Sequence, residues 1–322
     1  MDSKTREETL LAAIASGETS GITPHTREEQ YLSYIAGESD TKPEPVTRKE
    51  KLLDAITQGG GGGGGTSNKF GQLVDGSIAE IAAEDFGEVT TIRTSAFAGI
   101  KNLVSVEIPY GVTSIGDSSF NNCTNLISAV VPNSVKSIGN NAFMGCENLT
   151  AINIPYGVTI IGTGMLGYCS SLKNIVIPDG VTSIGYNAFS NCTALENIEI
   201  PQSVTSIGGS ALSGCASLKS IEIPDNVEMI SNSLLMGSNL EYITLGSGVK
   251  NIENYSLYVP INNRLKRIMV KAVNPPSLAS YAIGNVNADV RIEVPAESVD
   301  AYKAATNWSK FADYIFAIEE EE

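Results

Sequence analysis

Residues 177–208 read IPDGVTSIGYNAFSNCTALENIEIPQSVTSIG, and the pattern I-P-x-x-V-T-S-I-G occurs twice in this stretch, 23 residues apart. The same interval governs the sequence on both sides. All five cysteines of the chain follow it: Cys123, Cys146, Cys169, Cys192 and Cys215. A fixed period of this length is typical of a solenoid, in which each unit stacks on the next. The sequence therefore predicts a repeat solenoid of 23-residue coils over residues 70–270.

One repeat can be written A-F-x-x-C-x-x-L-x-x-I-x-I-P-x-x-V-T-S-I-G-x-x. The L-x-x-I-x-I segment alternates apolar and variable positions, as a half-buried strand does. Pro ends this strand because it has no N–H to donate, and V-T-S-I forms a second short strand. A-F-x-x-C predicts a brief helical or irregular corner whose Phe and Cys fill the core. Short parallel strands stacked about 4.8 Å apart then align these apolar side chains in internal columns.

A column of thiols raises the question of metal binding or disulfides. Metal sites use paired short spacings such as C-x2-C, and this chain has none. Stacked side chains in register rarely reach the dihedral angle of a disulfide, whereas free Cys packs as a small apolar residue. We predict buried free thiols and no metal. Residues 162–167 spell G-x-G-x-x-G, but Gly162 is the repeat glycine, so we expect no nucleotide cofactor either.

Composition narrows the class of function. The net charge of −15 disfavours nucleic acid, and no apolar segment is long enough to span a membrane. The single histidine, His25, lies outside the repeats, so no Ser-His-Asp arrangement fits inside them. No paired carboxylates stand out. We therefore expect a binding or structural protein, not an enzyme.

The outward positions of the first strand are the candidate ligand-binding face, because solenoids present their strand sheet as a platform. The position between the two inward Ile side chains faces out once per coil, and the position after Leu does so too. The candidate residues are Val104, Glu107, Ile127, Val130, Asn153, Val176, Glu199 and Glu222. Val104, Ile127, Val130 and Val176 are expected to form an exposed apolar strip, with ordinary surface variation as the alternative.

Residues 1–58 contain a second, shorter repeat. The motif T-R-E-E or T-R-K-E recurs every 21 residues. In each copy it forms a capping box, and the apolar positions that follow it lie on one helical face. The apolar residues are Leu10, Leu11, Ile14, Tyr31, Leu32, Ile35, Leu52, Leu53 and Ile56. We predict three short helices that dock on a partner or self-associate; packing on each other or on the main domain is the alternative. The Gly-rich residues 59–69 form a flexible linker.

Residues 271–322 are expected to cap the last coil. A helix is predicted around 298–305, and Trp308, Phe311, Tyr314 and Phe316 supply large apolar groups to cover the end. Before the cap, the segment Met236-Gly237-Ser238-Asn239-Leu240 is one residue short of the repeat. We assign the missing residue to the cysteine position.

The unit L-x-x-I-x-I-P-x-x-V-T-S-I-G-x-x-A-F-x-x-C resembles the BspA-type leucine-rich repeat over residues 89–270, and the tail VPAESVDAYKAATNWSKFADYI resembles segments that close such arrays. That family consists mainly of surface proteins that bind bacterial or host ligands, and it offers no catalytic residues. The resemblance implies a leucine-rich-repeat array with short parallel strands and binding of an unknown surface protein or glycan.

The pattern T-R-x-E-x-x-L-x-x-I followed by glycines resembles the start of phage and prophage virion proteins. The charged N-terminus also lacks the apolar region of a secretory signal. The sequence-based hypothesis is therefore a virion fibre or head-decoration protein, made in the bacterial cytoplasm. Residues 1–58 would attach it to a virion structural protein or form a trimer. The alternative is a bacterial cell-surface adhesin or scaffold.

Overall fold

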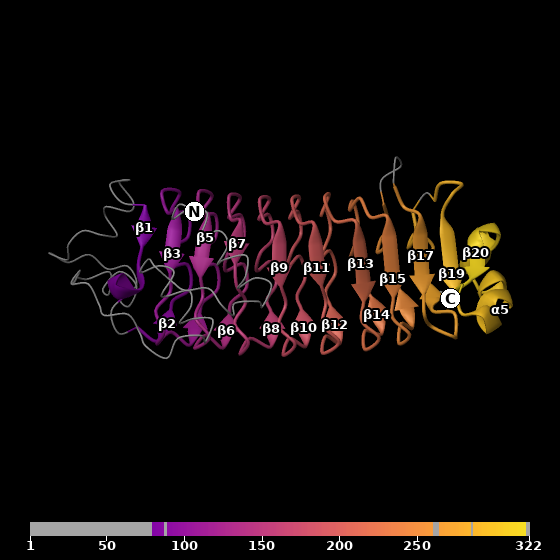
Figure 1. Cartoon of the computed structure of the whole chain (residues 1–322), viewed down its shortest axis with the longest axis horizontal. Coiled ribbons are helices and arrows are strands. Elements are labelled where there is room, and N and C mark those ends of the chain that lie inside the picture. The colour runs from indigo at the N-terminus through magenta and orange to yellow at the C-terminus, as the bar shows by residue number, and fades with distance from the viewer. Residues whose placement is uncertain (1–78, 87–88, 260–263, 285, 320–322) are drawn as a thin grey trace, which may run out of the picture.

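The computed structural model describes residues 79–86, 89–259, 264–284 and 286–319. It is an elongated parallel β-solenoid, with strands of successive coils side by side along the long axis (Figure 1). The predicted leucine-rich-repeat solenoid of 23-residue coils is confirmed. The N-terminal segment 1–58 and the linker 59–69 lie outside the described residues.

Each coil contributes one strand to each of two faces. The odd-strand face carries the L-x-x-I-x-I segments, and β20 completes it at the C-terminal end. Its strands are β1 (Glu80–Ile81), β3 (Ser105–Glu107), β5 (Ser128–Val130), β7 (Ala151–Ile152), β9 (Asn174–Val176), β11 (Asn197–Glu199), β13 (Ser220–Ile223), β15 (Tyr242–Leu245), β17 (Arg267–Val270), β19 (Arg291–Val294) and β20 (Ile315–Ala317).

The even-strand face carries the V-T-S-I segments in the same order. Its strands are β2 (Thr91–Ile92), β4 (Ser114–Ile115), β6 (Ser137–Ile138), β8 (Ile160–Ile161), β10 (Ser183–Ile184), β12 (Ser206–Ile207), β14 (Met229–Ile230), β16 (Asn251–Ile252) and β18 (Ser277–Leu278). Pairing is parallel and in register with the repeat, as in Ile184 opposite Ile207. Each position therefore stacks on its counterpart in the next coil.

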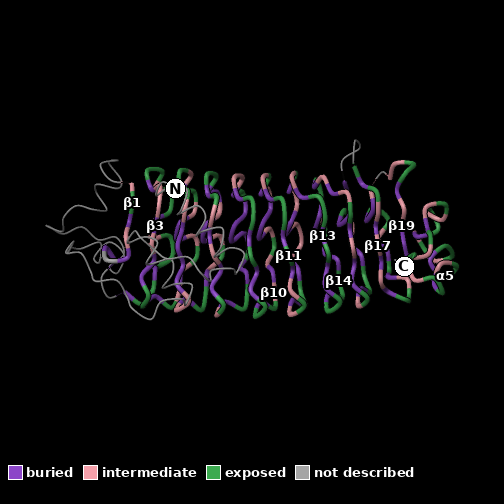
Figure 2. Tube along the Cα trace, in the orientation of Figure 1, coloured by how far each residue is buried: buried purple, intermediate pink, exposed green. Residues whose placement is uncertain are grey.

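The interior consists of these stacked columns, and their residues form the buried stretches that recur from coil to coil along the tube (Figure 2). Phe97, Phe120 and Phe143 stack with ring centroids 5.0 Å apart and planes 6° apart. The repeat glycine forms a second column, against the backbone of the preceding coil. A Cβ at Gly208 would lie 2.5 Å from the backbone nitrogen of Tyr186, so only glycine allows the coils to approach this closely there.

The A-F-x-x-C corner consists of turns rather than a helix. Two positions adopt positive φ in each of seven successive corners, and one does in the corner after β16, which the sequence analysis did not anticipate. The first column is Ser95, Ser118, Asn141, Gly164, Asn187, Ser210, Ser233 and Tyr255; the second is Gly99, Asn122, Gly145, Tyr168, Asn191, Gly214 and Gly237. Gly and Asn suit these positions because they tolerate the left-handed region best.

All five cysteines are free and fully buried, as predicted. Each thiol donates to a backbone carbonyl of the preceding coil; Cys146 Sγ, for example, lies 3.2 Å from Phe120 O. The prediction that the short coil loses its cysteine position is wrong. Ser238 occupies that position, is fully buried, and donates to Leu212 O at 2.8 Å. The omitted residue therefore lies between Ser238 and Leu240.

Strands β18 and β19 extend the two faces within the predicted cap, short helices follow, and β20 then pairs with β19. These helices are η2 (Ala296–Ser298), α5 (Val299–Ala304) and η3 (Trp308–Tyr314); η1 (Ala83–Phe86) lies at the other end of the described chain. Buried Tyr302 and Trp308 donate to the carbonyls of Ala272 and Pro276 at 2.7 and 2.8 Å. Phe311 and Tyr314 pack against the core, whereas Phe316 on β20 is 38% exposed and lies beneath Arg291.

Candidate functional site

The odd-strand face presents the outward columns that the sequence predicts. In β3, for example, Val106 is buried while Ser105 and Glu107 point outward and are half-buried. Ile127 and Val176 are exposed at 47% and 43%, Val104 is half-buried, and Glu199 and Glu222 are exposed. The columns therefore exist, although their members differ in accessibility.

Val130 is buried, with only 7% of its surface exposed, so the predicted continuous apolar strip is wrong at this point. Its register partner on β3 is Glu107, and Asn153 follows in the next coil. The Asn153 side chain bonds the neighbouring backbone: its Oδ1 accepts from Val131 N at 3.0 Å and its Nδ2 donates to Val131 O at 2.5 Å. Asn153 thus extends the inter-coil ladder with its side chain, and Val130 lies between two covering neighbours.

The second half of the odd-strand face carries charges instead of apolar groups. Lys266 Nζ bonds Glu241 Oε2 at 2.7 Å, and Lys271 Nζ bonds Glu222 Oε1 at 2.7 Å across two coils. The hydrogen bond from Lys266 lowers the pKa of the Glu241 carboxyl. Tyr242 lies beneath Lys266, whose Nζ is 5.5 Å from the ring centroid. Charge on this half is mostly neutralised locally.

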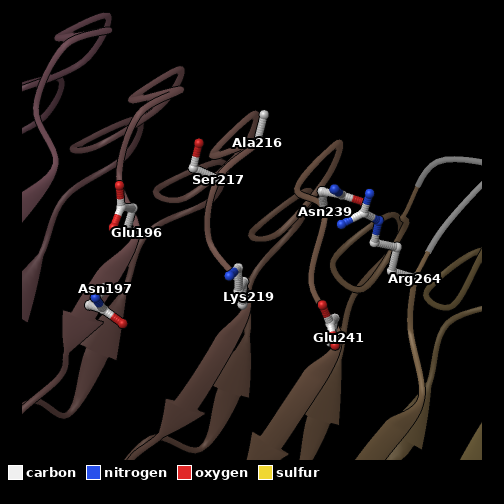
Figure 3. A pocket seen from close by; sticks show the side chains of 8 residues that line it. All are labelled: Glu196, Asn197, Ala216, Ser217, Lys219, Asn239, Glu241 and Arg264. Carbon is white, nitrogen blue, oxygen red and sulfur yellow. The ribbon is translucent and has the colours of Figure 1, made fainter.

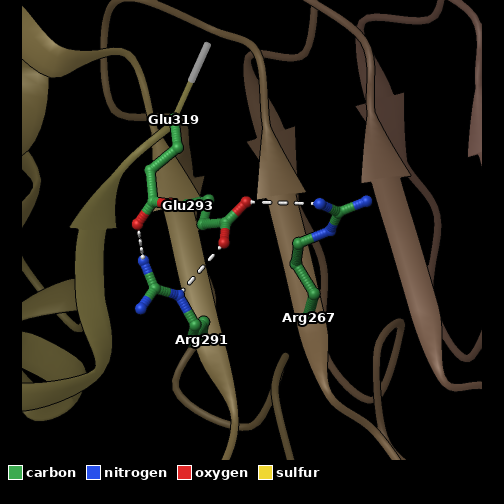
Figure 4. A network of polar contacts seen from close by, with 4 residues as sticks. All are labelled: Arg267, Arg291, Glu293 and Glu319. Carbon is green, nitrogen blue, oxygen red and sulfur yellow. Dashed lines mark hydrogen bonds and ion pairs between the residues drawn. The ribbon is translucent and has the colours of Figure 1, made fainter. Parts of the chain in front are cut away.

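A network of four charged residues closes this face near the C-terminal end (Figure 4). Glu293 is nearly buried and accepts from Arg291 Nε at 3.1 Å, while Arg267 Nη1 lies 3.7 Å from its other oxygen. Arg291 also binds Glu319 at 2.9 Å. These partners fix the two guanidinium groups in place, so neither is left free for a ligand.

A hollow of about 400 Å³ opens where the spacing of the repeats changes (Figure 3). It lies beside the N-terminal ends of β11, β13 and β15. Its lining is Glu196, Asn197, Ala216, Ser217, Lys219, Asn239, Glu241 and Arg264. The sequence analysis missed it, although both departures from the 23-residue interval are visible: Leu240 follows Leu218 by 22 residues, and Leu265 follows Leu240 by 25.

The hollow combines paired and unpaired charge. Glu241 is bound to Lys266, whereas Glu196, Lys219 and Arg264 form no side-chain hydrogen bond or ion pair within the described part of the chain. Both cations act electrostatically on Glu241. Among the cations on this half of the face, Lys266, Arg267, Lys271 and Arg291 all have carboxylate partners. Lys219 and Arg264 are therefore the cations available to an anionic ligand.

The interior offers no ionised nucleophile. Burial raises the pKa of the Cys123 and Cys215 thiols to about 12, and it raises that of Cys169 and Cys192 as well. A thiol held neutral and buried neither attacks a substrate nor binds a metal readily. Over the described residues there is no group of three or more His, Cys, Asp or Glu side chains placed to hold a metal ion. Nor is any helix there long and apolar enough to cross a bilayer.

Comparison with known proteins identifies the family. The family described as the BspA type leucine-rich repeat region matches residues 75–196, 136–263 and 184–287, so the matches together extend over 75–287. The chain belongs to the BspA-type leucine-rich repeat family. Families of such repeats are binding scaffolds, and the match indicates no catalytic family. No curated protein matches the chain.

Solved structures with a similar fold come from several bacteria. A leucine-rich repeat protein of T. pallidum shares 29% identity, with 53% of this chain and 83% of that chain covered and a TM-score of 0.42. One from Bacteroides ovatus shares 20% identity over 72% and 88% of the two chains, with a TM-score of 0.41. The pneumococcal vaccine antigen PcpA shares 17% identity over 76% and 79%, with a TM-score of 0.46.

The nine apolar residues of the predicted N-terminal docking helices, from Leu10 to Ile56, lie outside the described residues. Their role in docking or self-association stays a prediction. The resemblance of this segment to virion proteins has no support from the comparisons, which match the repeats from residue 75 onward.

Proposed function

We propose that the chain is a bacterial cell-surface binding protein that contacts an anionic group of a surface protein or glycan through its odd-strand face. The hollow at Lys219 and Arg264 carries this proposal, because it holds two cations without a carboxylate partner on the half of the face where Lys266, Arg267, Lys271 and Arg291 are paired. Charged groups aligned on an accessible platform give specificity and steer association. The solenoid provides such a platform because its strands are rigid and in register.

Membership of the BspA-type family supports the cell-surface role, since the family consists mainly of bacterial surface proteins. The virion hypothesis depends on residues 1–58 and on their resemblance to phage proteins. It stays the second candidate, in which the same solenoid would present its ligand-binding face on a particle. In both cases the solenoid binds a ligand and performs no chemistry.

The binding face is tested by charge reversal. The double variant Lys219→Glu, Arg264→Glu should reduce attachment of the labelled, purified chain to intact target cells at least tenfold. The control Lys136→Glu, Lys250→Glu makes the same change in net charge on the even-strand side, where both residues are exposed. Equal loss in both variants would reject the odd-strand face and indicate an effect of net charge.

Location is tested separately in the producing bacterium. Antibodies against the solenoid should label intact cells without permeabilisation. Labelling that requires lysis, with the protein recovered in purified particles, would favour the virion candidate instead.

A further inference from the structure

A cluster of three tyrosines lies in the corners that follow β16 and β18, and no earlier coil of the described chain stacks tyrosine rings in its corner. Tyr255 follows β16 and Tyr281 follows β18, so they lie in consecutive coils. Their rings stack with centroids 5.9 Å apart and planes 10° apart. Tyr258 meets Tyr255 edge-on, with centroids 5.9 Å apart. None of the three tyrosines lines the hollow beside the odd strands.

Tyr255 differs from the other residues at its positive-φ repeat position. It adopts φ of 59°, and the equivalent residues in the seven preceding coils are all Ser, Asn or Gly. The left-handed region is unfavourable for a bulky residue, and such strain is retained mainly where surrounding structure or function requires it. Burial does not explain this one, because Tyr255 is 41% exposed.

Tyr281 offers the open surface of the cluster. One side of its ring is covered by Tyr255, yet the residue is 63% exposed, so the other side faces solvent. The Tyr255 ring lies within 10° of parallel to it. A flat, accessible aromatic face is thus built from two residues of different coils.

From this geometry we propose that the Tyr255–Tyr281 stack binds a neutral saccharide ring. A sugar presents C–H groups on one face that pack on an aromatic ring, and hydroxyls at its rim that need polar partners. Asn254 lies beside Tyr281, since its Oδ1 accepts from Tyr281 N at 3.2 Å, and Ser280 next to Tyr281 is exposed; these two residues supply such polar groups. The exposed Glu253 in the same corner disfavours an acidic sugar at this place.

The test uses the full chain and a panel of neutral hexasaccharides of glucose, N-acetylglucosamine, galactose and mannose, titrated by calorimetry. At least one should bind. Tyr281→Ala should weaken that binding at least tenfold, and Tyr281→Phe, which keeps the ring, should stay within threefold. Tyr156→Ala removes an isolated tyrosine that is 71% exposed, and it should leave binding unchanged.

A second pair of variants separates binding from folding. Tyr255→Asn relieves the left-handed strain, so its melting temperature should be no lower than that of the parent, yet it should lose saccharide binding. Tyr168→Asn is the matched control: Tyr168 also has positive φ, at 62°, and 49% exposure, but it lies in the other column without an aromatic neighbour. It should bind normally.

The proposal would be overturned if no hexasaccharide binds, or if only a cationic probe such as choline binds. It would also be overturned if Tyr156→Ala or Tyr168→Asn weakens binding as much as the cluster variants do. Full binding by Tyr255→Asn would overturn it too. Binding that persists in Lys219→Glu, Arg264→Glu is expected, because none of the three tyrosines lines the hollow. Failure at one site is therefore distinguishable from failure at the other.

Discussion

The interior columns and the outward columns of the odd-strand face follow the same period but obey different rules. Inside, the position of Cys169 holds cysteine in five consecutive coils and then a serine that makes the same hydrogen bond. Outside, the column of Val176 changes between apolar, amide and carboxylate side chains. Packing therefore requires similar residues at the buried positions of every coil, whereas the outward residues can differ from coil to coil. Substitutions at buried positions should therefore lower the free energy of unfolding more than substitutions at outward positions.

The largest difference is expected at the phenylalanine column. Phe120 is fully buried between Phe97 and Phe143, with 5.0 Å to each ring centroid. Phe120→Ala removes both stacks and leaves a cavity that the rigid coils cannot close, so it should lower the free energy of unfolding by about 3–5 kcal/mol. Chemical denaturation monitored by circular dichroism measures this loss.

The control for that variant is Phe120→Leu. The chain itself places Leu166 and Leu212 in this column, so the coil geometry accepts leucine. Its cost should be no more than half that of the alanine variant. Equal costs for the two would mean that ring stacking, and not filled volume, stabilises the column.

The thiol column predicts a dependence of stability on pH. The pKa of the Cys123 thiol is about 12 in the folded chain against 9.0 for an exposed thiol, because burial disfavours the thiolate. Below pH 9 the thiol is protonated in both states and contributes no pH dependence. Above it the unfolded state loses its proton first, so stability falls by about 1.4 kcal/mol per pH unit for each such thiol, until the folded form also ionises near pH 12.

Cys123→Ser tests this, because Ser238 shows that a hydroxyl fits the column. Between pH 9 and 11 the free energy of unfolding of the variant should fall less steeply than that of the parent, by about 1.4 kcal/mol per pH unit. An exposed neighbour, Asn125→Ser, should not change the slope. Rapid reaction of the native chain with a thiol reagent at pH 8 would contradict the assignment of a buried neutral column.

Much of the interior was predictable from sequence because every buried position recurs at the same interval. Leu103 and Val112 are fully buried as the pattern requires, and so are their counterparts in later coils. Gly and Asn recur at the paired positive-φ positions, but the residues there vary too much for the left-handed backbone to be predicted from sequence. Tyr255 and Tyr168 in particular give no sign of left-handed backbone.

The outward side was less predictable because exposure depends on neighbouring coils. Alternation predicts an exposed Val130 on β5, at the register position of the half-buried Glu107, yet Val130 is buried. The hollow depends on two changes of coil length acting together, around Asn239 and Arg264. In the sequence, each change of coil length is a separate interruption of the repeat. In three dimensions the two changes lie close together and form one concave surface.

The smallest effect is expected at an ion pair of the outward set. Lys271 and Glu222 lie 2.7 Å apart, but their side chains are 38% and 60% exposed, so water and salt screen the attraction. A double-mutant cycle with Lys271→Ala and Glu222→Ala should give a coupling energy of about 0.2–1 kcal/mol that declines in high salt. A coupling of about 3 kcal/mol or more, as for a buried pair, would contradict the expected difference between the two kinds of column. An outward column would then stabilise the fold as strongly as an inward one. The weak coupling expected here is what allows these positions to vary from coil to coil without loss of the solenoid.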